Sequence, residues 1–262
     1  KSHRSVEERK IIEQAVEDYI AIKRIDGREK KTIEINQLAL SLFMDRYGYK
    51  KPIEFVTWSD IKNFKEWSQK VHAPNTTNIY LAKIKTFLRF CYKKKYIKNE
   101  VEVDMVRAEK KPPMYLSETK LSKLFTTDCV DEHFRRSFLF YVMTGCRLRE
   151  PFEGEFTGDW LIITPEVAKT NKTREVQLNQ ITKSILIEMR NRYDRLINSS
   201  GNGTWSKSHR GITDTYSRQF KKAARYEGFG EHKLHNLRDT YAVRRWIESG
   251  DIFLVSKEIG HA

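Results

Sequence analysis

Apolar residues recur at helical spacing through the first 108 residues, in four runs separated by glycine or proline. Gly27 and Gly48 end the first two runs, and Thr57 with Asp60 resembles a capping box that opens the third. The predicted helices cover residues 11–26, 32–47, 57–71 and 75–95. Short connections between four amphipathic helices predict a compact bundle.

The pattern changes in the second half. Ser117 is expected to cap a short helix, and a second helix over 131–144 should end at Gly145. Residues 160–163 (WLII) are continuously apolar and 174–178 (REVQL) alternate, so they predict two strands of one hairpin. The remaining predicted helices cover 181–197, 213–227, 233–242 and 252–257. The chain is therefore predicted to be mainly α, with a small antiparallel sheet in its second half.

Residues 108–116 carry no apolar periodicity, and their two prolines favour an extended backbone. We interpret this stretch as a basic linker, with Lys110 and Lys111 available to DNA, although a plain surface loop would look similar. It separates a helical domain, 1–107, from a mixed α+β domain, 117–262.

The net charge of the chain indicates which class of binding partner to expect. Lys and Arg number 49 against 35 Asp and Glu, giving a net charge of +14 that favours a polyanion, with nucleic acid the first candidate. An acidic membrane surface is the competitor, but no apolar run is long enough to span a bilayer. Cys91, Cys129 and Cys146 form no C-x-x-C pair, which argues against a zinc site or disulfide framework and fits a reducing cytosol.

The fourth predicted helix is strongly basic on one side. This side is either a solvated back to a core helix or a phosphate-contacting face, and both interpretations stay open. Its candidate DNA-binding residues are Lys83, Lys85, Arg89, Lys93, Lys94 and Lys95.

Residues 233–242, KLHNLRDTYA, place His235 and Arg238 three apart, side by side on one helix face. Alone, this pattern is typical of a solvated face. Three further motifs accompany it. Thr144-Gly145-Cys146-Arg147 with Glu150, and then a hairpin Lys169, precede His235-x-x-Arg238 in the chain, and Gly260-His261 follows it. The ordered set resembles the tyrosine recombinase (phage integrase-like) family, whose catalytic domain carries T-G-x-R-x-x-E, a hairpin lysine, H-x-x-R and G-H. The resemblance covers about 117–262 by motif, and the helical half resembles the family's core-binding domain in character only.

Transfer of a DNA phosphodiester concentrates negative charge on the non-bridging oxygens of the transition state. Arg147 and Arg238 are permanently charged and shaped for bidentate contact, so they can stabilise that charge without a metal or other cofactor. His235 can exchange a proton with the nucleophile or donate to a phosphate oxygen, and His261 is a second imidazole donor.

The resemblance also assigns a catalytic general acid and one supporting residue. A lysine on a hairpin can reach the leaving 5′ oxygen as a general acid. Lys169 opens the K-x-N-K-x-R stretch where the family's lysine sits, with Lys172 as the competing candidate and otherwise a DNA contact. Glu150 is expected to support the site rather than to act chemically.

The family's nucleophile is a tyrosine a little beyond the G-H motif, and this sequence ends at Ala262. Tyr241 falls on the apolar stripe of its helix and is interpreted as a core residue, while Tyr216 and Tyr226 have no supporting motif. We therefore expect the native protein to continue, and the present chain to bind DNA without cleaving it.

The resemblance implies a site-specific recombinase or integrase that forms a covalent 3′-phosphotyrosyl intermediate. It also implies a two-domain clamp on double-stranded DNA and a homotetramer at the recombination site. A type IB topoisomerase shares the catalytic pattern and is the nearest enzyme alternative. A helical DNA-binding regulator would explain the charge but not the ordered motifs. A metal-dependent transposase needs clustered carboxylates, for which no matching spacing exists.

Overall fold

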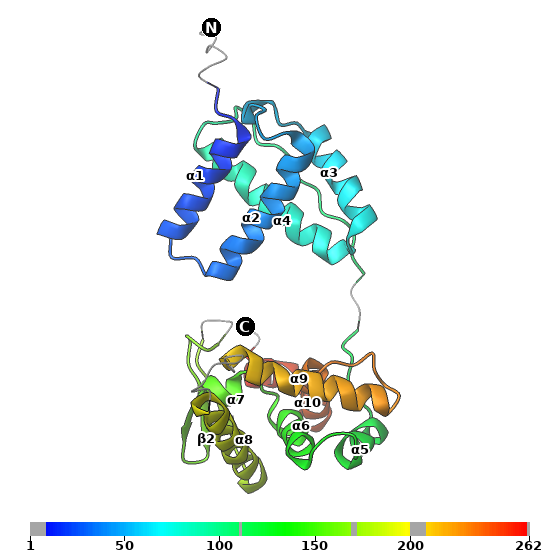
Figure 1. Ribbon diagram of the computed structural model, residues 1–262. Helices are drawn as coiled ribbons and strands as arrows, with labels where there is room; N and C mark the ends of the chain where they lie inside the picture. The colour runs from blue at the N-terminus through cyan, green and yellow to red at the C-terminus, as the bar shows by residue number, and fades with distance from the viewer. Residues whose placement is uncertain (1–8, 110–111, 169–171, 200–207, 261–262) are drawn as a thin grey trace. The chain divides into compact units, whose positions relative to one another are not determined.

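The computed structural model describes residues 9–109, 112–168, 172–199 and 208–260, and the chain divides into two compact units, Lys1–Lys110 and Lys111–Ala262 (Figure 1). Helices build the first unit, and the second combines helices with a small antiparallel sheet. The predicted fold class, mainly α with a small sheet, is confirmed. None of the described helices has the length and apolar character needed to cross a lipid bilayer.

Four helices and one short 3-10 turn make up the described part of the first unit. They are α1 (Ile12–Ile25), α2 (Lys30–Tyr47), η2 (Ile53–Phe55), α3 (Trp58–Val71) and α4 (Pro74–Lys93). The predicted capping box opens α3, where the Thr57 hydroxyl accepts the Asp60 N–H and the Asp60 carboxylate accepts the Thr57 N–H at 2.8 Å. The four predicted helices are confirmed, with small shifts at their ends.

Helix α4 lies at the centre of the first unit and packs against α1, α2 and α3 (Figure 1). Leu81, Ile84 and Phe87 on its inner face are fully buried. The chain after α4 returns across the unit, because the side-chain amide of Asn78 donates to the Val106 carbonyl at 2.8 Å and accepts the Val106 N–H at 2.7 Å. The apolar face of α4 thus forms the core, and its basic side chains are left outside.

Helix α6 has the same central place in the second unit, where it packs against α5, α8, α9 and α10. The described helices are α5 (Glu118–Thr126), α6 (Glu132–Thr144), α7 (Glu150–Glu153), α8 (Gln180–Asn198), α9 (His209–Tyr226), α10 (His235–Ser249) and α11 (Ile252–Glu258). Ser117 caps α5 as predicted, with its hydroxyl accepting the Lys120 N–H. Because four helices hold α6, the position of its C-terminal end is well fixed.

Three short strands form one antiparallel sheet in the order β1 (Glu155–Thr157), β2 (Trp160–Ile163), β3 (Arg174–Gln177). The two predicted strands are confirmed, whereas β1 and the four-residue α7 were not predicted. Gly158, at φ +60°, opens the two-residue turn between β1 and β2. Arg174 and Val176 share the buried face of β3, since alternate residues of a strand point to the same side.

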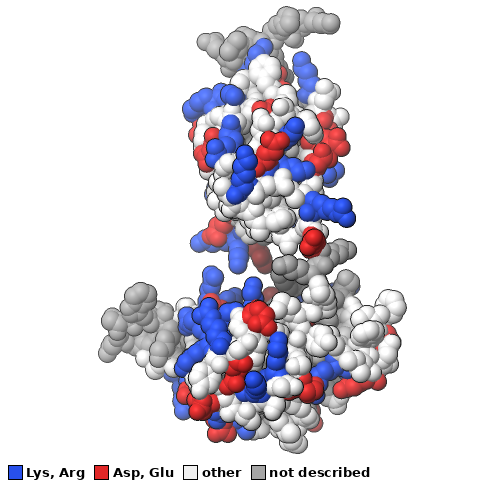
Figure 2. All heavy atoms as spheres, turned by 90° about the vertical axis from the view of Figure 1, so that its right-hand side faces the viewer, with Lys and Arg blue, Asp and Glu red and all other residues white. Residues whose placement is uncertain are grey.

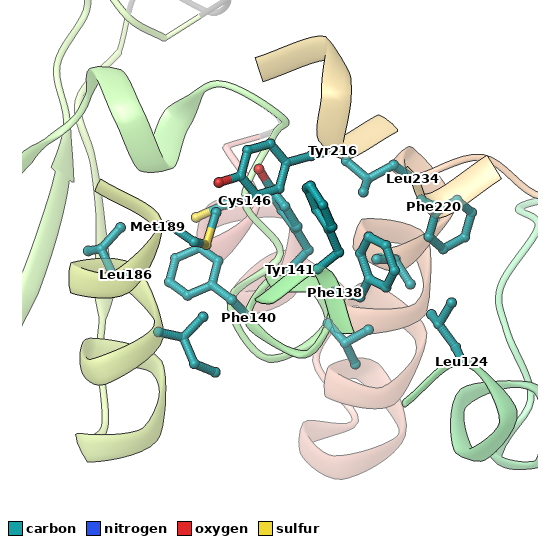
Figure 3. Close-up of a cluster of buried hydrophobic side chains, with 14 of the residues drawn as sticks. Leu124, Phe138, Phe140, Tyr141, Cys146, Leu186, Met189, Tyr216, Phe220 and Leu234 are labelled. Atoms are coloured by element: carbon teal, nitrogen blue, oxygen red, sulfur yellow. The ribbon is translucent and has the colours of Figure 1, made fainter. Parts of the chain in front are cut away.

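Aromatic residues of α6 fill the core of the second unit. Figure 3 shows Phe138, Phe140 and Tyr141 projecting from α6 among side chains of the neighbouring helices. Phe138 meets Phe220 of α9 edge-on, with ring centroids 5.5 Å apart, and Met189 of α8 is fully buried in the same cluster. This packing fixes the helix from which the candidate site begins.

A buried histidine links three helices beside this core. His133 of α6 lies with Nδ1 2.8 Å from Glu188 of α8 and Nε2 2.9 Å from the Tyr216 hydroxyl of α9. The geometry fits a neutral imidazole that donates to the carboxylate and accepts from the phenol. Burial lowers the pKa of His133, against the opposing effects of Glu188 and Asp131, and Arg192 lowers it further.

We expect the second unit to lose stability as the pH falls below about 6.5, the usual pKa of histidine. The folded-state pKa of His133 is depressed, so the unfolded chain binds more protons in acid and is stabilised relative to the folded state. The advantage of the wild type over His133→Gln in urea unfolding should therefore shrink between pH 7 and pH 5. A difference that does not change with pH would show that the pKa of His133 is the same in the folded and the unfolded chain.

Candidate active site

The candidate site begins where α6 ends. Gly145 adopts a left-handed conformation at φ +63°, and its N–H donates to the Tyr141 carbonyl at 3.0 Å. The ring of Tyr241 from α10 covers Gly145 so closely that a Cβ atom would lie 2.5 Å from Tyr241 Cδ1. Glycine is therefore required twice, by its φ angle and by the space available. The turn leads the chain into the segment that carries Arg147.

Glu150 holds Arg147 at the start of α7. The carboxylate accepts the Arg147 backbone N–H at 2.6 Å through Oε2 and the Arg147 guanidinium at 2.8 Å through Oε1. Glu150 is only 2% exposed, while the Arg147 side chain is 22% exposed. The Tyr141 hydroxyl fixes the same turn by donating to the Leu148 carbonyl at 2.7 Å. Arg147 is therefore a partly buried, oriented arginine rather than a free surface residue.

Arg174, from β3, is the site residue that the sequence interpretation missed. Its Nη2 pairs with Glu150 Oε2, and its Nη1 donates to the Glu258 carbonyl at 2.9 Å. The alternation of apolar and polar residues along the strand already indicates a buried arginine, because Arg174 occupies the buried face together with Val176 and Leu178. An arginine on the apolar face of a strand must have a buried partner, and here the partner is the carboxylate that holds Arg147.

Arg238, on α10, is almost completely buried. Its Nη1 donates to the Gly145 carbonyl at 2.6 Å, and its Nη2 donates to the carbonyl of Ile259 just after α11. Burial, together with the positive charges of Arg147 and Arg174, lowers the pKa of Arg238 to about 10. Arg238 therefore does not lie on a solvated face, which is what the His235-x-x-Arg238 pattern alone would suggest, but points into the unit between the ends of α6 and α11.

We call Arg147, Arg174, Arg238 and Glu150 the arginine cluster. The guanidinium groups of Arg147 and Arg174 pair with one carboxylate, and that of Arg238 lies close enough to feel their charges, so the three arginines and one glutamate carry a net charge of +2 in a largely buried setting. Such an excess is unfavourable without a further anion. The partly exposed Arg147 leaves the cluster open to solvent on one side, which suits it to bind a phosphate group. The described residues contain no group of three or more His, Cys, Asp or Glu that could hold a metal ion.

Helix α11 closes the candidate site from its C-terminal side. The Asp251 carboxylate caps its N-terminus by accepting the Phe253 N–H at 2.8 Å. Glu258 in its last turn accepts the Tyr241 hydroxyl at 3.0 Å and pairs with Arg245 of α10 at 2.9 Å. These contacts tie α11 to α10, and the carbonyls of residues 258 and 259 face the arginine cluster.

Solved structures of integrases bound to DNA match nearly the whole chain, including the following three. A lambda integrase tetramer bound to a Holliday junction aligns with a TM-score of 0.75 at 16% identity, covering 100% of this chain and 83% of that one. A lambda integrase dimer bound to a COC′ core site gives 0.73 at 17% identity, with 96% and 95% covered. The Tn1549 transposon integrase in complex with transposon right end DNA gives 0.69 at 13% identity, with 97% and 92% covered. The chain has the tyrosine-recombinase fold. No protein-family model and no curated protein sequence matches it.

Two of the five predicted catalytic residues meet within this tyrosine-recombinase fold, a third lies apart from them, and the remaining two are not among the described residues. Arg147 and Arg238 belong to the arginine cluster, whereas His235 is exposed at the first turn of α10 and bonds to no described residue of the cluster. Lys169 and His261 lie outside the described residues. Lys172 is exposed just before β3, so the choice between the two hairpin lysines stays a prediction.

The tyrosines near the site have assigned partners. Tyr241 is half-buried with its hydroxyl on Glu258, and burial together with that carboxylate raises its pKa to about 12. Tyr216 is buried in the core against His133, and Tyr226 lies exposed at the end of α9. The interpretation of Tyr241 as a core residue is partly corrected, since its ring packs on Gly145 but its hydroxyl belongs to the α10–α11 contact.

The predicted DNA-binding residues lie mostly on accessible surface. Lys83 and Lys85 are half-buried on α4, Arg89 is exposed and paired with Glu100 at 2.9 Å, and Lys110 and Lys111 lie outside the described residues. The basic run that follows is exposed at and beyond the end of α4, at Lys93, Lys94 and Lys95. Basic and acidic side chains are interspersed in both units on the face drawn in Figure 2. Whether α4 contacts DNA stays a prediction.

Proposed function

We propose that this chain is the DNA-binding and phosphate-binding part of a site-specific recombinase, which breaks and rejoins DNA strands through a covalent 3′-phosphotyrosyl intermediate. The observation that carries the proposal is the arginine cluster, a buried excess of positive charge with one open side, at the end of α6. The tyrosine-recombinase fold supports it, because structural neighbours with this fold are integrases in complex with DNA.

In the proposed reaction a tyrosine oxygen attacks the scissile phosphorus, and the bond to the 5′ oxygen breaks. Arg147 contacts the non-bridging oxygens, and the buried Arg238, whose Nη atoms are held by the Gly145 and Ile259 carbonyls, adds its positive charge from the protein interior, so that no metal is required. Lys169 donates a proton to the leaving 5′ oxygen, and His235 and His261 hydrogen-bond the phosphate or exchange a proton with the nucleophile. Glu150 acts through Arg147, whose backbone and guanidinium it holds.

The nucleophile is proposed to be a tyrosine outside the printed sequence. Tyr216 is buried against His133, which makes it inaccessible to DNA. Tyr241 donates its hydroxyl to Glu258, and its raised pKa opposes formation of the attacking phenolate. Tyr226 is exposed but belongs to the last turn of α9, with no contact to the arginine cluster among the described residues.

The proposed partner is a recombination site in double-stranded DNA. Recombination requires four strand exchanges, and the matching lambda integrase structure is a tetramer on a Holliday junction, which supports a homotetramer on DNA for this protein too. The net charge of +14 and the exposed lysines at the end of α4 favour phosphate contacts along the duplex.

We expect DNA binding by this chain to weaken steeply with salt. Each phosphate neutralised by a lysine or arginine releases counterions, so 6–10 such contacts would lower the affinity roughly 10³- to 10⁵-fold between 50 and 200 mM salt. Fluorescence anisotropy with a labelled duplex of about 30 base pairs measures this slope. An affinity that is flat in salt would contradict binding through the basic surface.

The proposal is tested by looking for the covalent intermediate. A duplex is first selected from a random pool by binding to this chain, and a nick near the cleavage point is added to trap the product. The complete protein encoded by the gene is then incubated with this duplex in EDTA and denatured in detergent. We expect a protein–DNA adduct that yields phosphotyrosine on digestion.

The control is the same protein with Arg190→Lys, which alters a half-buried arginine on the carbonyls of Pro151 and Gly154 but leaves every member of the arginine cluster. It should still form the adduct. Specific binding without any adduct from the wild type would favour the DNA-binding regulator and reject the recombinase.

A further inference from the structure

Arg174 joins two parts of the site that lie far apart in the sequence. Its guanidinium contacts the Glu150 carboxylate on one side and the Glu258 carbonyl on the other. We propose that Arg174 is a positioning residue, which sets the Arg147 turn and the turn at Gly260, directly before His261, in a fixed relation to one another. This inference rests on the proposed function for its catalytic consequence, but its structural part stands by itself.

The first contact controls Arg147. Glu150 uses Oε1 for the Arg147 guanidinium and Oε2 for the Arg147 backbone N–H, and Arg174 binds that same Oε2. Both bonds to Arg147 come from the same turn of the chain, whereas Arg174 adds a bond from a separate element, β3, and so ties the carboxylate to the sheet. Arg174 therefore fixes the plane of the carboxylate that orients Arg147.

The second contact controls the end of α11. Arg174 Nη1 donates to the Glu258 carbonyl and Arg238 Nη2 donates to the next carbonyl, Ile259, so two cations bind the last carbonyls of one helix. Gly260 adopts φ +63° and packs on Arg174, since a Cβ there would lie 3.2 Å from Arg174 Cδ. The side chain of Arg174 thus packs directly against the Gly260 turn.

The charge of Arg174 indicates that it does more than fill space. It lies on the buried face of β3 with Val176 and Leu178, where an apolar side chain would pack without any desolvation cost. Its positive charge also adds to the repulsion that lowers the pKa of Arg238. The planar guanidinium compensates for the cost of burying this charge by donating hydrogen bonds in two directions. A lysine ammonium has no such forked arrangement of donors and cannot replace it.

Arg174 acts through its neighbours rather than on the phosphate itself. Both of its Nη atoms are occupied within the protein, and its Nε is covered from solvent without a partner in the described structure. The partly exposed member of the cluster is Arg147, which is 22% exposed against 5% for Arg174. A bound phosphate would meet Arg147 first.

The structural part is tested by amide hydrogen exchange, followed by NMR on this chain. The informative amides are those of Arg147, which donates to Glu150, and of Gly260, which donates to the Lys257 carbonyl at 3.0 Å. Arg174→Lys should lower the protection of both by about tenfold or more, although they belong to different elements. Arg135→Lys is the matched control, because Arg135 also holds two carbonyls, Thr127 at 2.6 Å and Val130 at 3.3 Å, without touching the cluster.

The catalytic part is tested in the complete protein with the adduct assay, at saturating DNA and a temperature where all variants are folded. We expect Arg174→Lys to keep its DNA affinity within about twofold while the single-turnover rate falls roughly 10- to 100-fold. Arg135→Lys should keep both. Arg174→Met, which keeps volume but removes the charge, should be no faster than Arg174→Lys.

The outcomes separate the two proposals. Unchanged protection of both amides in Arg174→Lys overturns the positioning role whatever the activity. Reduced protection with a wild-type rate overturns its catalytic consequence. Reduced protection together with a wild-type protein that forms no adduct keeps the positioning role and rejects the recombinase.

Discussion

Replacing Glu150 with glutamine is expected to lower the free energy of unfolding of the second unit by about 3–5 kcal/mol. The change keeps the shape of the side chain but removes the only negative charge within the arginine cluster. Arg174 and Arg238 would then remain buried beside Arg147 with no counter-charge, and one amide oxygen cannot serve the donors that two carboxylate oxygens serve. Urea unfolding, followed by far-ultraviolet circular dichroism, measures the loss.

The neighbouring carboxylate on α7 provides the control. Glu153 pairs with His209 at 2.6 Å, but both side chains are about one-third exposed. Exposed ion pairs contribute little, so Glu153→Gln should cost about 1 kcal/mol or less. Equal losses for the two variants would mean that the cluster does not depend on its single carboxylate, and would undermine its description as a charge-unbalanced site.

Gly145→Ala is expected to cost about 3 kcal/mol, the sum of a backbone term and a packing term. Alanine at φ +63° is disfavoured by itself, and its Cβ would lie 2.5 Å from Tyr241 Cδ1. Relief of this clash moves either the Tyr241 ring or the turn whose carbonyl accepts from Arg238. Thermal or urea unfolding of the variant measures the sum.

Gly158→Ala separates the two terms. Gly158 has nearly the same backbone conformation, φ +60°, but no heavy atom lies within 4 Å of the position a Cβ would take. It should therefore show only the backbone term, about 1–2 kcal/mol. Tyr241→Leu combined with Gly145→Ala should recover part of the packing term, and strictly additive losses would exclude the clash.

Helix ends that are defined by local sequence signals could be predicted from the sequence alone. Thr57 with Asp60 predicts the start of α3, and Gly145 predicts the end of α6, because a cap or a left-handed residue acts within one turn of the chain. Helix α7 and strand β1 escaped prediction because four and three residues are too few to show a period. Their position is set by tertiary contacts, such as those of Arg190 with the Pro151 and Gly154 carbonyls.

Only those site residues that belong to the sequence motifs could be predicted from the sequence. Arg147 and Arg238 were found from the ordered motifs, and the structure brings both to the end of α6. The burial of Arg238 was not foreseen, because i,i+3 spacing predicts a shared face and does not say which face is covered. Arg174 was missed because its strand was read for alternation alone, although an arginine in phase with Val176 already indicates a buried partner.

The proposed role of the arginine cluster is to neutralise the charge of a scissile phosphate. It is tested most directly by comparing Arg147→Ala in the complete protein on two nicked duplexes, one natural and one with an uncharged methylphosphonate at the cleaved position. Arg147 is chosen because its side chain is the partly exposed member of the cluster, so its removal leaves the buried contacts in place. On the natural phosphate the variant should form the adduct roughly 10²- to 10³-fold more slowly than the wild type. On the methylphosphonate, where there is less negative charge to stabilise, its rate should approach that of the wild type; an equal defect on both duplexes would contradict the claim.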